Sequence, residues 1–241
     1  MNKRVLITGG AKGLGKSIAT EFAENGWDVI ITYYQSKQEA LTLCHELKNT
    51  YKIDATCEYL DITNEECINN LVEKIDYLDS LINNAAYNYD CNVFEKDKSH
   101  FMLTFDTNVI GPFLLSQKLY ENLKESKGSI VNIASTNGID SMYKESIDYD
   151  ASKAALINLT KNLANAFAPQ VRVNAIAPGW IETPNTEDMA LDFRGKELSK
   201  IALHRFANPE EIAKLVYFIS TDNASYMTGS IIRIDGGRAW M

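Results

Sequence analysis

The sequence predicts a single α/β domain over residues 1–241, built on a doubly wound parallel sheet of about seven strands with helices on both faces. Short, nearly continuous apolar runs recur between amphipathic stretches, which is typical of parallel strands buried on both faces. The chain is 45% apolar and 23% charged, so one domain of this length can bury a sizeable core.

The expected elements alternate along the chain. The apolar runs predict strands at 5–8, 29–32, 55–60, 80–82, 129–133, 171–176 and 231–234. Helical periodicity predicts helices at 14–23, 37–48, 64–75, 100–123, 149–167 and 209–220. Residues 180–205 lack clear periodicity, and we interpret them either as a mobile segment over a substrate cleft or as a plain surface excursion.

Composition excludes several classes of function. A net charge of -8 and the lack of a basic stripe argue against a nucleic-acid partner. The four cysteines and three histidines are scattered without zinc-binding spacing, so we expect no metal and reduced thiols in a cytoplasmic protein. No secretory leader precedes the first strand, and no apolar run approaches the ~20 residues needed to span a membrane.

A glycine-rich turn joins the first strand to the first helix. Glycines let the backbone approach a phosphate, and the helix N-terminus offers unpaired N–H groups and a favourable dipole. The strand–turn–helix context favours a dinucleotide site over a plain tight turn. The expected cofactor contacts of this turn are Thr8, Gly9, Lys12, Gly13, Leu14 and Gly15.

The end of the second strand predicts the choice of cofactor. No carboxylate stands there to accept the 2'-hydroxyl of NAD. Lys12, with Ser36 or Lys37, could instead bind a 2'-phosphate, and Tyr34 lies at the same corner. We therefore expect NADP(H) to be preferred, with NAD(H) as the alternative if both lysines are merely solvated.

Polar residues follow the next two strands at the edge where a dinucleotide would lie. Asp61 could accept from the adenine amino group, or it could form a helix-entry turn. Asn83 could fix the ribose region or tie adjacent strands together. Ile62 and Ala85 are expected to contact the cofactor beside them.

Tyr149 and Lys153 are four residues apart on a predicted helix, so both side chains can point into one cleft. A free tyrosine has a pKa of ~10, and a neighbouring ammonium group can favour its ionised form. Ser135 lies shortly upstream. The three residues predict a proton relay beside a nicotinamide, although such a pair alone is often a solvated surface pair.

Together these motifs resemble the short-chain dehydrogenase/reductase family, a group of Rossmann-fold oxidoreductases, over essentially the whole chain. The resemblance implies that Tyr149 gives a proton to a carbonyl oxygen that Ser135 positions. It also implies that Lys153 lowers the Tyr149 pKa and holds the nicotinamide ribose, and that Asn108 supports a water leading to solvent. The matching motifs are Thr8 to Gly15, Asn83-Asn84-Ala85, Asn108, Ser135, Tyr149-x-x-x-Lys153, Pro178-Gly179 with Thr183, and Asp235-Gly236-Gly237.

Further along the chain, the resemblance implies that Pro178, Gly179, Ile181 and Thr183 hold the nicotinamide end of the cofactor. It also implies a homotetramer in which the last strand, ending in Trp240 and Met241, buries apolar surface between subunits.

The resemblance predicts hydride transfer between a nicotinamide and a carbonyl or secondary alcohol. The pattern is most similar to 3-oxoacyl-acyl-carrier-protein reductases and to bacterial sugar or polyol dehydrogenases. An acyl carrier protein stays an open partner, because only Lys124 and Lys127 lie near the expected docking strand and the net charge is -8. A non-catalytic redox sensor is the alternative from another class.

Overall fold

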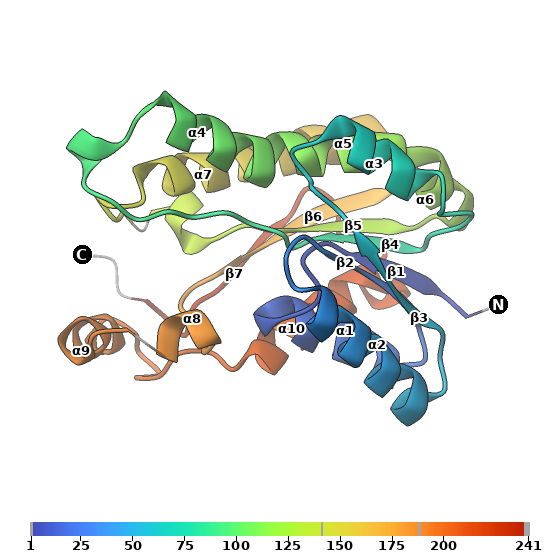
Figure 1. Ribbon diagram of the computed structural model, residues 1–241, viewed down its shortest axis with the longest axis horizontal. Helices are drawn as coiled ribbons and strands as arrows, with labels where there is room; N and C mark the ends of the chain where they lie inside the picture. Colours follow the sequence, from blue (N-terminus) through green and yellow to red (C-terminus); the bar gives the residue numbers. More distant parts are fainter. Residues whose placement is uncertain (1, 141, 188, 239–241) are drawn as a thin grey trace.

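A seven-stranded, wholly parallel sheet forms the centre of the molecule (Figure 1). The computed structural model describes residues 2–140, 142–187 and 189–238. The strand order is β3-β2-β1-β4-β5-β6-β7, so the predicted sheet is confirmed. The strands are β1 (Arg4–Ile7), β2 (Asp28–Tyr33), β3 (Ala55–Tyr59), β4 (Ser80–Asn83), β5 (Ser129–Ile133), β6 (Arg172–Pro178) and β7 (Ile231–Ile234).

Helices cover both faces of this sheet (Figure 1). One face carries α1 (Gly13–Glu24), α2 (Lys37–Tyr51) and α10 (Pro209–Ser220). The other carries α3 (Glu65–Val72), α4 (Lys98–Phe105), α5 (Gly111–Lys118), α6 (Tyr120–Ser126) and α7 (Ile147–Phe167). The two short helices α8 (Pro184–Glu187) and α9 (Leu191–Ser199) lie at the left-hand end of the view.

Alternate residues of β1 enter two separate cores, which explains why the strand is apolar throughout. Val5 and Ile7 belong to the cluster that packs with α1 and α10, whereas Leu6 belongs to the cluster that packs with α3 and α5. All three side chains are fully buried. Burial of both faces is what a parallel sheet between two helical layers requires.

The chain reverses its direction of travel across the sheet at β1. It passes outward from β1 through β2 to β3, and then crosses back so that β4 pairs with the other side of β1. Ile7 is thereby in register with Ile31 on one side and Ile82 on the other. Ligands of such folds bind in the crevice that opens beyond this switch point.

Two expectations from periodicity were wrong in detail. The helix expected at 100–123 is divided into α4, a π-helical segment (Asp106–Ile110), α5 and α6. Pro112 stands in the first turn of α5, where the missing N–H of proline is tolerated. The segment 180–205 contains α8 and α9, which are too short to give a clear periodic pattern. Trp240 and Met241 lie outside the described residues.

The sequence predicts neither a metal site nor a membrane-spanning helix. Within residues 2–140, 142–187 and 189–238, no group of three or more His, Cys, Asp or Glu side chains could hold a metal ion. In the same part of the chain, no helix has the length and apolar character required to cross a bilayer.

Candidate active site

The glycine turn lies at the switch point and needs its glycines for two reasons. Gly9 and Gly13 have φ of 64° and 50°, a region that side chains with a Cβ rarely adopt. A Cβ on Gly15 would overlap the carbonyl oxygen of Gly9. The turn therefore folds tightly over the end of β1 and leaves the N-terminus of α1 open, without a capping side chain.

Thr8 and Asn84 fasten this turn to the end of β4. The Thr8 hydroxyl oxygen accepts hydrogen bonds from the backbone N–H groups of Asn84 and Ala85, both at 3.0 Å. The Asn84 amide donates to the carbonyl oxygens of Thr8 and Gly9 at 2.9 and 3.1 Å. Thr8 is fully buried, so the structure places it beneath the groove as a support rather than as the expected contact.

Asn83 takes the second of its two expected roles, which is to tie adjacent strands together. Its amide donates to Asn132 Oδ1 at 2.8 Å and to Ser116 Oγ at 3.2 Å. These contacts tie β4 to β5 and to α5, and the side chain is 2% exposed. Asn83 therefore joins adjacent strands, and the neighbouring Asn84 reaches the groove instead.

A groove of about 770 Å³ runs from the glycine turn across the ends of β2, β3 and β4. It draws on the predicted cofactor residues of the glycine turn and of the ends of β2, β3 and β4, whereas Tyr149, Lys153, Pro178 and Gly179 lie outside its wall. The predicted residues that line it are Gly9, Lys12, Gly13, Leu14, Gly15, Tyr34, Asp61, Ile62, Ala85 and Thr183.

The outer end of this groove carries a charged pair that the sequence analysis missed. Lys12 Nζ lies 2.6 Å from Glu39 Oε1, with side chains 57% and 47% exposed. The hydrogen bond from Lys12 lowers the pKa of Glu39. Ser36 and Lys37 stand at the start of α2 and do not line the groove.

Asp61 forms the expected helix-entry turn at the groove wall, and its contact with the adenine stays a prediction. It lines the groove, and its Oδ1 accepts from the Thr63 N–H at 3.0 Å and from the Thr63 hydroxyl at 2.7 Å. The helix-entry turn is therefore present at the groove wall. The turn fixes the carboxylate beside the end of β3.

Tyr149 and Lys153 lie together on α7, as their spacing predicts. Lys153 Nζ is 5.4 Å from the centre of the Tyr149 ring. The Lys153 side chain is 2% exposed, and its ammonium group donates to the carbonyl oxygen of Ile133 at 2.8 Å. Burial lowers the pKa of Lys153 to about 8.

Ser135 follows β5 and hydrogen-bonds Tyr149. Burial raises the pKa of Tyr149 to about 12, the hydrogen bond with Ser135 lowers it, and the Asp150 and Asp90 carboxylates raise it. The expected lowering by Lys153 is not found: Lys153 is not among the groups that shift this pKa, and the net shift is upward because burial dominates. A protonated tyrosine is the form that can donate a proton to a carbonyl oxygen.

Asn108 lies in the π-helical segment, where its side chain is fully buried. Its Oδ1 accepts from the Tyr87 N–H at 2.8 Å, while its amide donates to the Tyr87 carbonyl oxygen and to Ser152 Oγ, both at 2.9 Å. Asn108 thus holds the loop after β4 against α7. Its support of a water remains a prediction.

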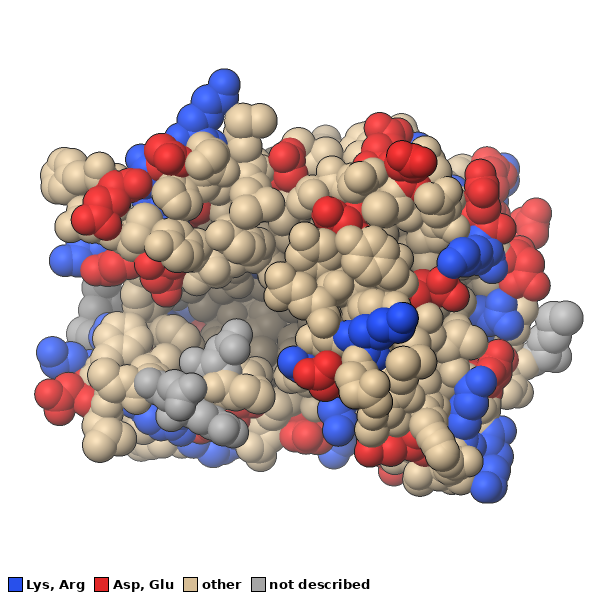
Figure 2. All heavy atoms as spheres, viewed as in Figure 1, with Lys and Arg blue, Asp and Glu red and all other residues tan. Residues whose placement is uncertain are grey.

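A second cavity, of about 940 Å³, contains Ser135, Tyr149 and Gly179 in its wall. The surface is hollowed on the face shown in Figure 2, in the left half of the view. This substrate cleft shares Ala86 and Tyr87 with the cofactor groove, so the two spaces meet beside the reactive side chains.

Comparison with known proteins agrees with this geometry. Residues 9–239 match the family model described as enoyl-(acyl carrier protein) reductase. A 3-oxoacyl-[acyl-carrier-protein] reductase of Aquifex aeolicus is 37% identical over 238 residues, covering 96% of this chain and 95% of that protein. The chain belongs to the short-chain dehydrogenase/reductase family. It is thus an NAD(P)-dependent dehydrogenase or reductase that binds a nicotinamide cofactor and a small-molecule substrate.

Solved structures of the family align over almost the whole chain. L-sorbose reductase of Gluconobacter frateurii, complexed with NADPH and L-sorbose, has a TM-score of 0.91 at 27% identity, over 98% of this chain and 96% of that one. Acetoin dehydrogenase of Salmonella typhimurium has a TM-score of 0.88 at 29% identity, over 99% and 96%.

Two residues expected at the nicotinamide end of this family site lie behind it. Pro178 is buried at the end of β6, and Ile181 forms a bridge with Ala207 and packs against the core. Gly179, between them, lines the substrate cleft, and a Cβ there would approach Asp235 Cβ to 2.9 Å. Pro178 and Ile181 line neither cavity, so their contact with the cofactor stays a prediction.

Sequence reasoning missed the side chains that shape the substrate cleft. They come from loops that are remote in sequence, and no local motif marks them. The cleft residues that were not expected include Asn137, Tyr143 and Arg238. Residues of the segment 180–205, such as Trp180 and Phe193, line the cleft, and the mobility expected of this segment stays a prediction.

Proposed function

We propose that this protein is an NADPH-preferring carbonyl reductase or secondary alcohol dehydrogenase that works through Ser135, Tyr149 and Lys153. The observation that carries the proposal is the place where the two cavities meet. Tyr149 and Ser135 face the substrate cleft there, and the buried ammonium of Lys153 lies behind the tyrosine ring.

The chain's own residues can carry out the proton transfer. A bound nicotinamide supplies or accepts the hydride. Tyr149 is protonated, because burial raises its pKa to about 12, and donates its phenolic proton to the carbonyl oxygen. Ser135 donates a hydrogen bond to the same oxygen and orients it. Lys153 stabilises the tyrosinate that forms, since the ammonium lies on the same face of α7.

The preference for NADPH rests on charge at the outer end of the cofactor groove. Lys12 lines the groove, and residues 32–37 provide no carboxylate at the end of β2. A 2'-phosphate beside Lys12 gains a charge-assisted hydrogen bond, whereas the 2'-hydroxyl of NADH lacks the acidic partner it needs. Ser36 and Lys37, at the start of α2, do not line the groove, so this proposal rests on Lys12.

For the substrate, two classes have separate support. The 37% identity to a 3-oxoacyl-[acyl-carrier-protein] reductase favours a 3-oxoacyl thioester. The polar wall of the cleft, with Asp90, Asn137 and Ser146, favours a hydroxylated carbonyl compound such as a ketose. The net charge of -8 opposes steering of an acidic carrier protein, so delivery by a carrier is the weaker alternative.

We also propose that residues 1–241 act as one domain and that the protein is a homotetramer. Large apolar side chains on α4 and near the start of α7 face outward, including Met102 at 52% and Ile147 at 42% exposure. Exposed patches of this kind mark association surfaces. Light scattering of the purified protein that gave a monomer would contradict this.

Cofactor titration followed by a substrate panel tests the function. Purified protein is titrated with NADPH and NADH, and consumption of the preferred cofactor is then followed with an acetoacetyl thioester, L-sorbose and acetoin. Tight NADPH binding with turnover of one compound is expected. Binding without turnover of any carbonyl or alcohol favours a redox sensor, and preference for NADH overturns the cofactor assignment.

A further inference from the structure

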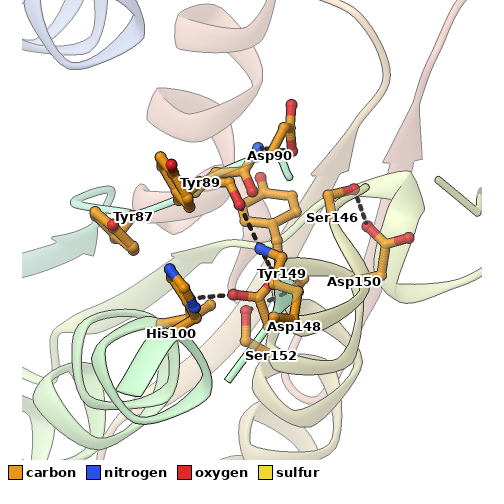
Figure 3. Close-up of polar contacts among 12 residues, drawn as sticks. Tyr87, Tyr89, Asp90, His100, Ser146, Asp148, Tyr149, Asp150 and Ser152 are labelled. Atoms are coloured by element: carbon orange, nitrogen blue, oxygen red, sulfur yellow. Dashed lines mark hydrogen bonds and ion pairs between the residues drawn. The ribbon is translucent and has the colours of Figure 1, made fainter. Parts of the chain in front are cut away.

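Two carboxylates flank Tyr149 in the sequence, at Asp148 and Asp150, and neither takes part in the proton transfer. Successive residues of an α-helix point about 100° apart, so side chains on either side of Tyr149 reach in different directions. Asp150 lies toward Ser146, whereas Asp148 lies toward Tyr89 and His100 (Figure 3). Each carboxylate therefore points toward a different loop beside the substrate cleft.

Asp148 holds the wall that follows β4, through a buried ion pair. Lys96 Nζ lies 2.7 Å from Asp148 Oδ1, and both side chains are almost fully buried. The same ammonium donates to the carbonyl oxygen of Tyr89, next to the cleft residues Asn88 and Asp90. Thr104 of α4 donates to the other Asp148 oxygen at 2.8 Å.

The contacts of this pair favour the ionised form of Asp148. Burial raises the pKa of Asp148, but the hydrogen bonds from Lys96 and Thr104 lower it further, and the net pKa is below its usual value. The Tyr89 ring stacks on His100 with ring centres 5.2 Å apart. The loop is therefore fixed at its backbone and at a side chain.

Asp150 holds the opposite wall, within the loop that joins Ser135 to α7. Its Oδ1 accepts from Asn137 Nδ2 at 2.6 Å and from Ser146 Oγ at 3.2 Å. Its Oδ2 accepts from the Tyr143 N–H at 3.0 Å. The side chains of all three partners line the substrate cleft. One carboxylate thus sets the positions of three cleft residues.

We infer that Asp148 and Asp150 are positioning residues, which fasten the two walls of the substrate cleft to the helix that carries Tyr149. The walls also meet each other, because the Cys91 N–H donates to the Glu145 carbonyl oxygen at 3.2 Å. Substrate geometry at Tyr149 then depends on both carboxylates. The inference deepens the proposed function and rests on it for its kinetic consequences.

The simpler account is that acidic residues in the first turn of a helix interact favourably with the helix dipole. That role needs neither the buried lysine nor the three donors around Asp150. The helix-dipole account predicts that the two carboxylates contribute only to the free energy of unfolding. The two accounts therefore differ in how the loss of each carboxylate affects the mobility of the loop that it contacts.

Hydrogen exchange followed by mass spectrometry separates them without any substrate. One variant is Asp150→Ala. The other is the double variant Lys96→Met with Asp148→Asn, because removing one member of a buried ion pair leaves an uncompensated charge that can prevent folding. Glu66→Gln is the matched control, since Glu66 also lies in the first turn of a helix but far from the cleft in sequence and outside its wall.

Asp150→Ala is expected to speed exchange of the amides of residues 137–146 about tenfold or more, together with the Cys91 amide that donates to Glu145, and to leave the rest of residues 87–97 unchanged. The double variant should speed exchange of the amides of residues 87–97 and leave residues 137–146 unchanged. Glu66→Gln should change exchange in neither loop. Unchanged exchange in both loops, or equal acceleration throughout α7, overturns the inference in favour of simple helix stabilisation.

Kinetics with the compound turned over in the substrate panel give the second readout. Both variants should raise KM for that compound about tenfold, with a smaller change in kcat and no change in the Kd of NADPH. A fall in NADPH affinity, or a fall in kcat at constant KM, contradicts positioning of the substrate walls. If the wild-type protein turns over no compound, the proposed function fails, whereas the exchange result still decides whether the carboxylates fix the loops.

Discussion

The cofactor groove and the substrate cleft are built in different ways. The groove consists of a tight glycine turn and the ends of neighbouring strands, with one exposed ion pair between Lys12 and Glu39. The cleft consists of loops held together by buried charged side chains. Backbone geometry therefore forms the first site, and long-range side-chain contacts form the second.

Glu197 of α9 shows how strongly the cleft depends on such contacts. Its carboxylate accepts from the Tyr143 hydroxyl at 2.6 Å and from Trp180 Nε1 at 3.0 Å, and it pairs with Lys200 at 2.6 Å and Arg238 at 3.1 Å. The side chain is 2% exposed. These partners come from the 136–146 loop, the end of β6, α9 and the C-terminal region. Substitutions in the cofactor groove and in the substrate cleft should consequently have different effects on the protein.

The largest effect is expected for Tyr149→Phe, which removes the proton donor and keeps the ring. We expect kcat to fall by about 10²- to 10⁴-fold, the range of general acid–base contributions, with NADPH binding unchanged. Steady-state kinetics and a fluorescence titration measure both. Tyr143→Phe is the matched control, because it removes a hydroxyl from the cleft wall but leaves the proton relay intact. An equal loss in both variants would contradict the assignment of Tyr149.

Gly15→Ala should be the most damaging change in the cofactor groove. Its Cβ would overlap the Gly9 carbonyl oxygen, so the turn must open, at a cost of about 1–3 kcal/mol in unfolding free energy. NADPH affinity should fall with it. Gly195→Ala in α9 has open space around the new Cβ and should be neutral or stabilising by about 0.5–1 kcal/mol. Thermal unfolding and NADPH titration of both variants check this, and tight NADPH binding by Gly15→Ala would refute it.

Lys153→Met should stabilise the fold while removing activity. Burial lowers the pKa of Lys153 to about 8, so the unfolded chain binds more protons than the folded protein between about pH 8 and the ordinary pKa of lysine near 10.4. At neutral pH the buried charge of Lys153 therefore lowers the free energy of unfolding of the wild-type protein. This loss of stability disappears as pH rises through this window.

After allowance for the lost hydrogen bond to the Ile133 carbonyl oxygen, the variant should be more stable by about 2 kcal/mol at neutral pH. Denaturant unfolding at several pH values measures the difference. It should narrow between about pH 8 and 10. A difference that does not depend on pH would show that burial does not lower the pKa of Lys153.

The smallest effect is expected for Glu39→Gln at the outer end of the groove. Glu39 competes with a 2'-phosphate for Lys12, and exposed ion pairs of this kind are weak. NADPH affinity should rise about two- to fivefold at low salt, and NADH affinity should not change. Titration with both cofactors checks this. An equal rise for NADH would place the competition elsewhere.

The contrast between the two sites also explains what the sequence could predict. The sheet, the glycine turn and the Tyr149–Lys153 pair depend on apolar periodicity and short spacings, so they could be predicted. The sequence left two roles open for Asn83, because only the contacts with Ser116 and Asn132 show that it, and not the adjacent Asn84, is buried and ties the strands together. Lys96 and Asp148 are 52 residues apart in the sequence, so no local sequence pattern predicts their ion pair.

A crystal structure of the protein with NADPH would test the central claim most directly. We predict that the adenosine half lies between the glycine turn and Tyr34, with the 2'-phosphate at Lys12, and that the nicotinamide faces Tyr149 and Ser135 across space for one substrate carbonyl. A nicotinamide bound away from Tyr149, or a cofactor outside the groove, would contradict the account.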